Sequence, residues 1–265
     1  MVAGRVPVGW KPEEINPFTG QRYDDTWMVY FLTDTAKFNL MAGGQQVYSL
    51  SVSRQMAHWE FSLGDCIDYC RMGKRNCILS VTDQDMTRMS GIYAGHGCRE
   101  TRLRSEEPHV LVHSTTSAGW ESICRDSCVQ SWNRLRSSKP DWEPDPIGRL
   151  LHDPDDLRDM VMLSDPLASS SEIVVASRQA GELCMDTDKP YHPGARLYFD
   201  AKALARDGLL LRDGCHRMVE NELSLAPYLL WAATWKDVGL DAPRSTPSQF
   251  TALANAKFQS LFGKF

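Results

Sequence analysis

The fold class is decided by residues 195–230, ARLYFDAKALARDGLLLRDGCHRMVENELSLAPYLL. The first six residues have the aromatic content of a strand, and AKALARDG predicts a short helix that ends at Gly208. HRMVENEL predicts another strand. Strand, helix and strand follow one another within one short segment, which indicates an α+β fold.

The same mixture extends upstream of this segment. Val110–Val112 is β-rich, residues 117–132 have helical spacing, and strands are predicted for MVMLSD (160–165) and EIVVASR (172–178). Residues 132–160 are rich in Pro and Asp without periodicity, which is typical of a surface insertion. We therefore expect residues 106–232 to form one lobe that carries this insertion.

The remaining residues predict a lead-in, a helical lobe and a tail. Residues 1–25 are polar and predict an extended lead-in. Residues 26–105 predict a small helical lobe, because helical spacing or helix caps occur in DTWMVYFLTDTAKFNLMAGG (25–44), HWEFSLGDCIDYCRMGKRN (58–76) and TDQDMTRMSG (82–91). In residues 233–265, the apolar positions from Phe250 to Leu261 predict a terminal helix that packs on the body.

Composition limits the classes of partner. The 265 residues are 42% hydrophobic and 24% charged, which is ordinary for a globular protein. The net charge of −5 argues against a protein whose whole surface binds nucleic acid. RNA contact would need local basic patches, for which RMGKRN (71–76), RETRLR (99–104) and SWNRLRSSK (131–139) are candidates, although solvated loops also explain each of them. No apolar run is long enough to span a membrane and no signal core is visible, so we expect an intracellular chain.

The eight cysteines are expected to be thiols rather than a disulfide framework. Cys66/Cys70 and Cys124/Cys128 would each lie one turn apart on a helix, and could be halves of a zinc site. Their three-residue spacing and apolar neighbours favour structural cysteines instead. We therefore assign no metal ligands from the sequence.

Candidate site residues occur in three places. His96 lies between two glycines in IYAGHG, His113 follows an apolar run and precedes Ser114 and Thr115, and Arg178 ends EIVVASR. Two histidines near hydroxyl side chains could form a metal pair, a catalytic pair or a nucleotide pocket. They could also be unrelated core residues.

A family resemblance favours the nucleotide pocket. IYAGHG (92–97), VHSTT (112–116), VVASR (174–178) and residues 195–230 resemble, in order and spacing, four motifs of the NAD-dependent RNA 2'-phosphotransferases of the KptA type. The resemblance implies a winged-helix-like N-terminal lobe and an ADP-ribosyltransferase-like β-sandwich lobe. It also implies a reaction in which an RNA 2'-phosphate attacks the nicotinamide-bearing ribose carbon of NAD and expels nicotinamide.

The resemblance implies roles for particular residues. Arg178 and His96 would be catalytic, and His113, Ser114 and Thr115 would bind NAD, the co-substrate. The family's Leu-Arg-His motif falls on Leu40-Met41-Ala42, however, and the arginine of its Ile-Arg-Ala motif falls on Tyr93.

These missing cations leave three functions open. The chain could be an active phosphotransferase in which Arg54, His58 or Arg99 replaces them, or a transferase that modifies another acceptor. It could also be a non-catalytic subunit of an RNA–protein or other large assembly that keeps the fold.

Overall fold

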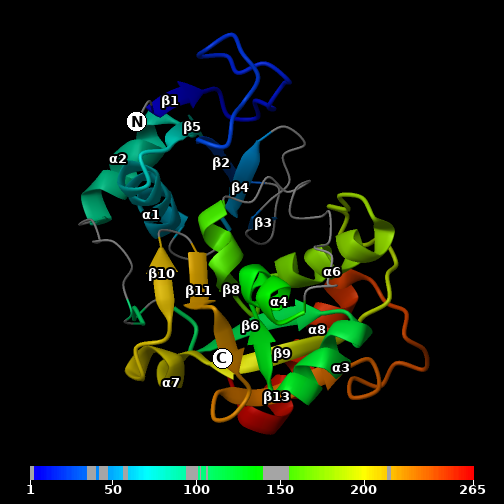
Figure 1. Ribbon diagram of the computed structural model, residues 1–265. Coiled ribbons are helices and arrows are strands. Elements are labelled where there is room, and N and C mark those ends of the chain that lie inside the picture. Colours follow the sequence, from blue (N-terminus) through cyan, green and yellow to red (C-terminus); the bar gives the residue numbers. More distant parts are fainter. Residues whose placement is uncertain are drawn as a thin grey trace. The chain divides into compact units, whose positions relative to one another are not determined.

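The computed structural model describes most of the chain and divides it into two compact units. The described residues are 3–34, 40–41, 47–55, 59–93, 101, 103–105, 107–139, 155–213 and 216–265. Unit 1 is Met1–Glu100, Gly148–Pro154 and Arg212–His216, and unit 2 is Thr101–Ile147, Asp155–Leu211 and Arg217–Phe265. Both contain helices and strands (Figure 1), which shows a mixed fold consistent with the predicted α+β class. None of the described helices has the length and apolar content needed to span a bilayer.

Unit 1 is built on a five-stranded sheet ordered β1-β5-β2-β4-β3. These strands are β1 (Ala3–Val6), β5 (Asn76–Ser80), β2 (Trp27–Thr33), β4 (Tyr48–Ser53) and β3 (Leu40–Met41). They are parallel except for β3, which is antiparallel to β4. Two helices accompany the sheet: α1 (Trp59–Met72) and α2 (Asp83–Ile92). The prediction of a helical lobe over residues 26–105 is therefore wrong.

Burial on both faces of β2 explains this error. Val29 packs with Ile78 in one apolar cluster, while Met28 and Tyr30, which point to the opposite face, are also buried. A strand buried on both faces has a continuous apolar run, which periodicity alone does not distinguish from a buried helix.

The start of α2 was predicted from its cap, and the structure confirms it. The Thr82 hydroxyl accepts a hydrogen bond from the Asp85 amide at 3.1 Å, and the Asp85 carboxylate accepts one from the Thr82 amide at 2.8 Å. This reciprocal pair is a capping box.

Thr82→Ala should lower the free energy of unfolding by about 1 kcal/mol, because the cap satisfies amides that have no partner within the helix. Urea denaturation measures the change. The control is Thr87→Ala in the same helix, where the hydroxyl donates to the Asp83 carbonyl and caps nothing. Equal losses in both variants would contradict a contribution that is specific to the cap.

Unit 2 contains short antiparallel sheets. One is ordered β13 (Leu229–Thr234), β9 (Ala195–Asp200), β6 (Val110–Thr115). A second pairs β11 (His216–Glu220) with β8 (Met160–Leu163) through Arg217–Glu220, and a third pairs β12 (Glu222–Ser224) with β7 (Cys128–Gln130). Strand β10 (Leu211–Asp213) and the start of β11 fall at the boundary, since Arg212–His216 is assigned to unit 1. The backbones of Val112 and Ser164 exchange two hydrogen bonds, so β6 also adjoins the end of β8. The helices among its described residues are α3 (Ser117–Asp126), α4 (Trp132–Ser138), the 3-10 helix η1 (Asp155–Asp159), α6 (Ser170–Ala180), α7 (Ala201–Arg206) and α8 (Pro247–Phe262).

Several predictions for this unit are confirmed, but the helix predicted over residues 117–132 ends at Asp126 and is followed by strand β7. The strands at β6, β8, β9 and β11, the short helix α7 and the terminal helix α8 lie where the sequence placed them. The strand predicted at residues 172–178 is wrong, because these residues lie in α6. Its run of β-branched residues favours a strand locally, but tertiary packing of the helix overrides that preference.

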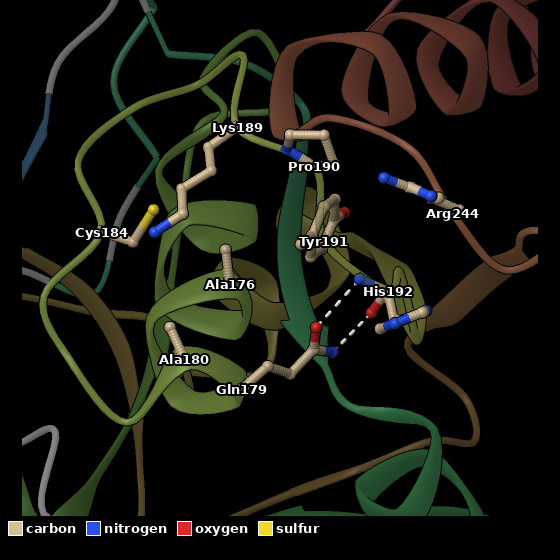
Figure 2. Close-up of a pocket in the computed structure, with 9 residues that line it drawn as sticks. All are labelled: Ala176, Gln179, Ala180, Cys184, Lys189, Pro190, Tyr191, His192 and Arg244. Carbon is tan, nitrogen blue, oxygen red and sulfur yellow. Dashed lines mark hydrogen bonds between the residues drawn. The ribbon is translucent and has the colours of Figure 1, made fainter.

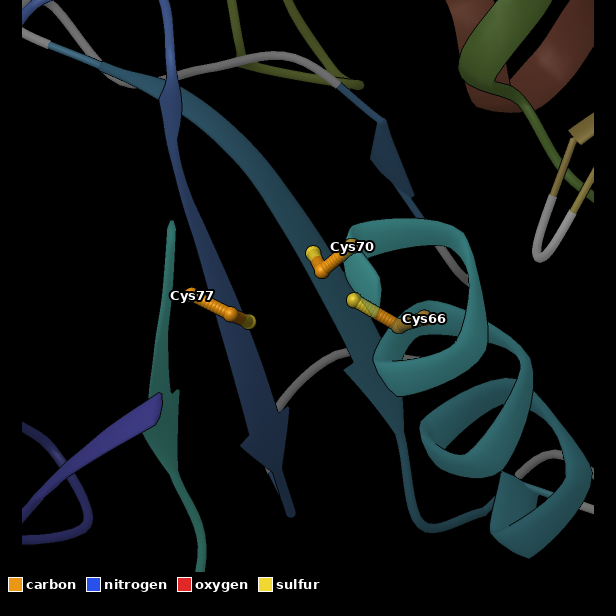
Figure 3. A group of neighbouring side chains, drawn as sticks. All are labelled: Cys66, Cys70 and Cys77. Carbon is orange, nitrogen blue, oxygen red and sulfur yellow. The ribbon is translucent and has the colours of Figure 1, made fainter. Parts of the chain in front are cut away.

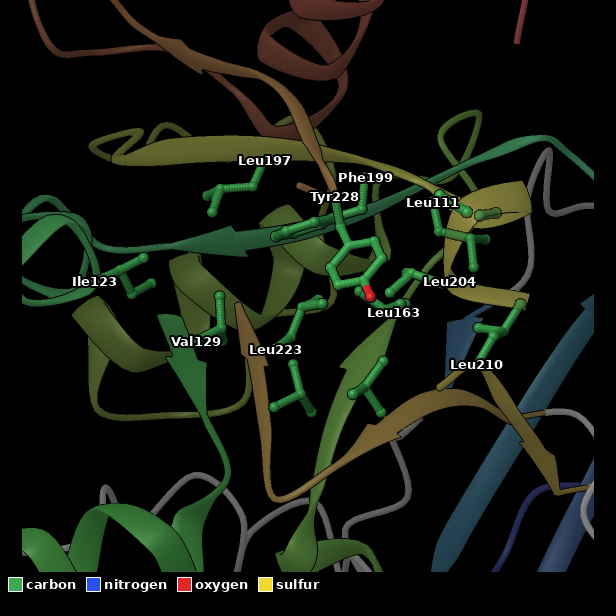
Figure 4. Packing of buried hydrophobic residues seen from close by; sticks show 14 of the residues in the cluster. Leu111, Ile123, Val129, Leu163, Leu197, Phe199, Leu204, Leu210, Leu223 and Tyr228 are labelled. Carbon is green, nitrogen blue, oxygen red and sulfur yellow. The ribbon is translucent and has the colours of Figure 1, made fainter. Parts of the chain in front are cut away.

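The sheet formed by β6 and β9 has apolar clusters on both faces. Figure 4 shows one cluster, in which Leu111, Leu197 and Phe199 pack with residues of β8 and α7. On the opposite face, Val112 and Tyr198 pack against Phe258 of α8. Since neighbouring residues of a strand point to opposite faces, His113 and Ser114 lie in different surroundings.

Candidate functional site

His113 is a partly buried residue of β6 with a defined tautomer. Its Nδ1 lies 3.1 Å from the carbonyl oxygen of Met162 in β8. Because a carbonyl only accepts, Nδ1 carries the proton and Nε2 is left as an acceptor. Burial lowers the pKa of His113 to about 4, and the positive charge of Arg178 acts in the same direction, against the hydrogen bond to Met162. The imidazole is therefore neutral at neutral pH.

Arg178 is close enough to His113 for its charge to act on the imidazole. It lies on α6, near the C-terminal end of the helix, and its side chain is partly buried. Helix α6 packs against β6. The charge of Arg178 thus reaches His113, and Arg178 comes from a helix and not from the predicted strand.

Ser114 and Thr115 are placed differently from His113. The Ser114 hydroxyl donates to the Glu172 carboxylate at 2.5 Å and is buried. Thr115 is buried against two glycines: a Cβ on Gly194 would lie 2.1 Å from the Thr115 carbonyl oxygen. Both residues therefore take part in internal packing, and their side chains do not line the same surface as the His113 ring.

The remaining predicted cations divide into two groups. His96, His58 and Arg99 lie outside the described residues. The guanidinium of Arg54 donates to Asp85 at 2.6 Å and to Asp34 at 2.9 Å, and the hydrogen bond to Asp85 raises its pKa. Arg54 is thus engaged with two carboxylates.

Tyr93, which the resemblance aligns with an arginine, also makes hydrogen bonds within the protein. Its hydroxyl donates to Asp65 at 3.0 Å and to Asp68 at 2.9 Å, both on α1. Burial raises the pKa of Tyr93, and the nearby negative charge of Asp65 does so further. This position is part of the internal structure of unit 1.

The sequence did not reveal a buried polar network beside Ser114. The Glu172 carboxylate of α6 accepts from Ser114, from the Tyr191 hydroxyl at 2.5 Å and from Arg196 of β9 at 3.2 Å. Burial raises the pKa of Tyr191, and the charge of Glu172 adds to this effect. The sequence indicates this network only through two charged residues inside apolar runs, Glu172 in EIVV and Arg196 in ARLYF.

A cavity of about 310 Å³ lies beside α6 (Figure 2). Its lining includes Ala176 and Gln179 of α6, and Gln179 exchanges two hydrogen bonds with the backbone of His192, at 2.5 and 2.9 Å. Neither His113 nor Arg178 is among the residues that line it. The cavity is thus separate from the His113–Arg178 pair.

Replacing His113 should change how stability depends on pH. The unfolded chain protonates this group near its ordinary pKa of 6.5, but the folded chain does so only near 4. The contribution of His113 is therefore complete above about pH 6.5 and is lost as the pH falls toward 4, by on the order of 3 kcal/mol. His113→Asn should flatten the loss measured by urea denaturation at about pH 7 and about pH 4.5.

The control for this measurement is His192→Gln, because the His192 side chain is exposed. It should keep the pH dependence of the original chain. An equally steep loss in His113→Asn would contradict the assignment of a buried neutral imidazole.

No family model, curated protein or solved structure matches this chain. Functional assignment consequently depends on the side chains just described.

Proposed function

We propose that the chain is an NAD-using protein of the RNA 2'-phosphotransferase type, with its site formed by His113 and Arg178. The observation that supports this proposal is that a neutral imidazole from β6 lies within range of the charge of a guanidinium from α6, the helix packed on that strand. The antiparallel sheets of unit 2 are compatible with the ADP-ribosyltransferase-like lobe that the resemblance implies, and we include that fold in the proposal.

The two groups suit the two halves of the reaction. With Nδ1 bound to a carbonyl, Nε2 of His113 can accept a hydrogen bond from a ribose hydroxyl and so orient the sugar. The guanidinium of Arg178 can donate paired hydrogen bonds to a phosphate. A phosphate oxygen would then form the new bond to the ribose carbon while nicotinamide leaves with the electron pair of the broken C–N bond. Local basic patches would supply the remaining contact with RNA.

A second candidate is a non-catalytic subunit of an RNA–protein or other large assembly. It is favoured by the internal hydrogen bonds of Tyr93 and Arg54, since the first replaces a cation of the family and the second is held by two carboxylates. Fewer cations would leave the charge of the transition state less well stabilised.

The deciding experiment is incubation with NAD and a 2'-phosphorylated oligonucleotide, with nicotinamide release measured by chromatography. Active protein should release nicotinamide, and Arg178→Leu should slow the release at least about 100-fold. Arg206→Leu, an exposed arginine of α7, is the matched control and should keep the rate.

The other outcomes separate the remaining functions. NAD-induced thermal stabilisation that His113→Ala abolishes, without turnover, would support NAD binding with another acceptor or with none. Absence of any NAD effect would overturn the proposal and leave the subunit function.

A further inference from the structure

Three cysteines meet in the interior of unit 1. Cys66 and Cys70 come from α1 and Cys77 from β5, and their sulfur atoms all lie within 4.8 Å of one another. Figure 3 shows the three side chains pointing into the space between the helix and the sheet. Their exposed fractions are 0%, 0% and 1%, so solvent does not reach them.

Local structure brings the third cysteine to the first two. Cys66 and Cys70 are four residues apart on α1 and therefore lie on one face of the helix. The chain reverses through Gly73 and Lys74, whose φ is 52°, and the amide of Arg75 donates to the Cys70 carbonyl at 2.8 Å. Strand β5 then starts at once, which places Cys77 beside the helix. Backbone hydrogen bonds thus fix this arrangement without a ligand.

The three sulfur atoms are shielded from solvent and lie near a further sulfur-containing side chain. Met28 of β2 is the register partner of Cys77 in the parallel sheet, so its buried side chain lies on the same face. Among the described residues, no fourth His, Cys, Asp or Glu joins the group. The positive charge of Arg75 acts on Cys70 and would offset part of the charge of a thiolate.

We propose that Cys66, Cys70 and Cys77 form a buried three-sulfur binding site for Cu(I). Thiolate and thioether sulfur select soft cations such as Cu(I), which accepts three ligands in a plane. Structural zinc normally takes four protein ligands, and the described residues supply three at this position. Each cysteine that binds as a thiolate releases one proton to the solvent, and the copper remains Cu(I) throughout.

The test is retention of Cu(I), supplied anaerobically, against a chromophoric Cu(I) chelator, followed by metal analysis of the gel-filtered chain. The original chain should retain one equivalent, and Cys70→Ser should weaken retention at least about 100-fold. Cys184→Ser is the matched control, because Cys184 is a buried thiol in unit 2. It should retain the metal unchanged. Circular dichroism verifies that each variant is folded.

X-ray absorption at the copper edge of the unaltered chain provides a test that no folding defect can obscure. It should show copper surrounded by sulfur alone. Nitrogen or oxygen ligands, no retained copper, or equal loss of copper from Cys184→Ser would overturn the proposal. Retention of zinc in preference to copper when both are offered would overturn the assignment to Cu(I).

Discussion

Arg196→Met should lower the free energy of unfolding by about 3–5 kcal/mol, because it leaves a buried carboxylate without its cation. Arg196 and Glu172 have exposed side-chain fractions of 0% and 1%, and their ion pair measures 3.2 Å. The same guanidinium donates to the carbonyls of Pro166 at 2.7 Å and Ala168 at 3.3 Å. Methionine fills similar volume but satisfies none of these acceptors.

A double-mutant cycle distinguishes the lost ion pair from lost packing. Glu172→Leu combined with Arg196→Met removes both charges, so the double variant should be more stable than the sum of the two single losses predicts. Arg206→Met is the surface control: its ion pair with Asp207 is exposed, and the midpoint of thermal unfolding should not change. Additive losses in the cycle would show that the two residues act independently.

This network also has a consequence for the candidate site. Glu172 and Arg178 are on the same helix, and Glu172 is tied to β6 through Ser114 and to β9 through Arg196. These contacts fix α6 against the strand that carries His113. The buried ion pair therefore positions Arg178, although it does not touch His113 itself.

Elements with local signals were predictable from the sequence. The caps of α2 and α7 at Thr82 and Asp200 are side-chain hydrogen bonds within three residues, and α8 starts with Thr246 as cap and proline in its first turn. These signals need no knowledge of the tertiary structure. Strand β2 and helix α6 have no comparably clear local signal, because burial in the tertiary structure decides between strand and helix in both.

The candidate site was predictable only in part, for a related reason. His113 and Arg178 were selected by resemblance, and their proximity depends on the packing of α6 against β6. Glu172 pairs with an arginine 24 positions away, which no local pattern indicates. Cys77 likewise joins Cys66 and Cys70 only because the turn after α1 brings β5 back beside that helix.

Phe258→Ala should lower the free energy of unfolding by about 3–5 kcal/mol, because it opens a cavity between α8 and the sheet. The ring is 1% exposed and stacks on Tyr198 of β9, with centroids 4.5 Å apart and an interplanar angle of 16°. It also packs with Val110 and Val112 of β6. Chemical denaturation measures the loss.

Phe262→Ala, one turn further along α8, is the matched control. Phe262 is 51% exposed, although its ring centroid lies 4.9 Å from that of Phe258, so its loss should be much smaller. Strand β6 lies between the two side chains, with His113 on one face and Phe258 packed against the other. Loss of the Phe258 ring should loosen this strand, so Phe258→Ala should also weaken any NAD-induced stabilisation, which His113→Ala would abolish. Equal destabilisation by Phe258→Ala and Phe262→Ala would contradict the packing of α8 on β6 and β9, and with it the support that the terminal helix gives to the site.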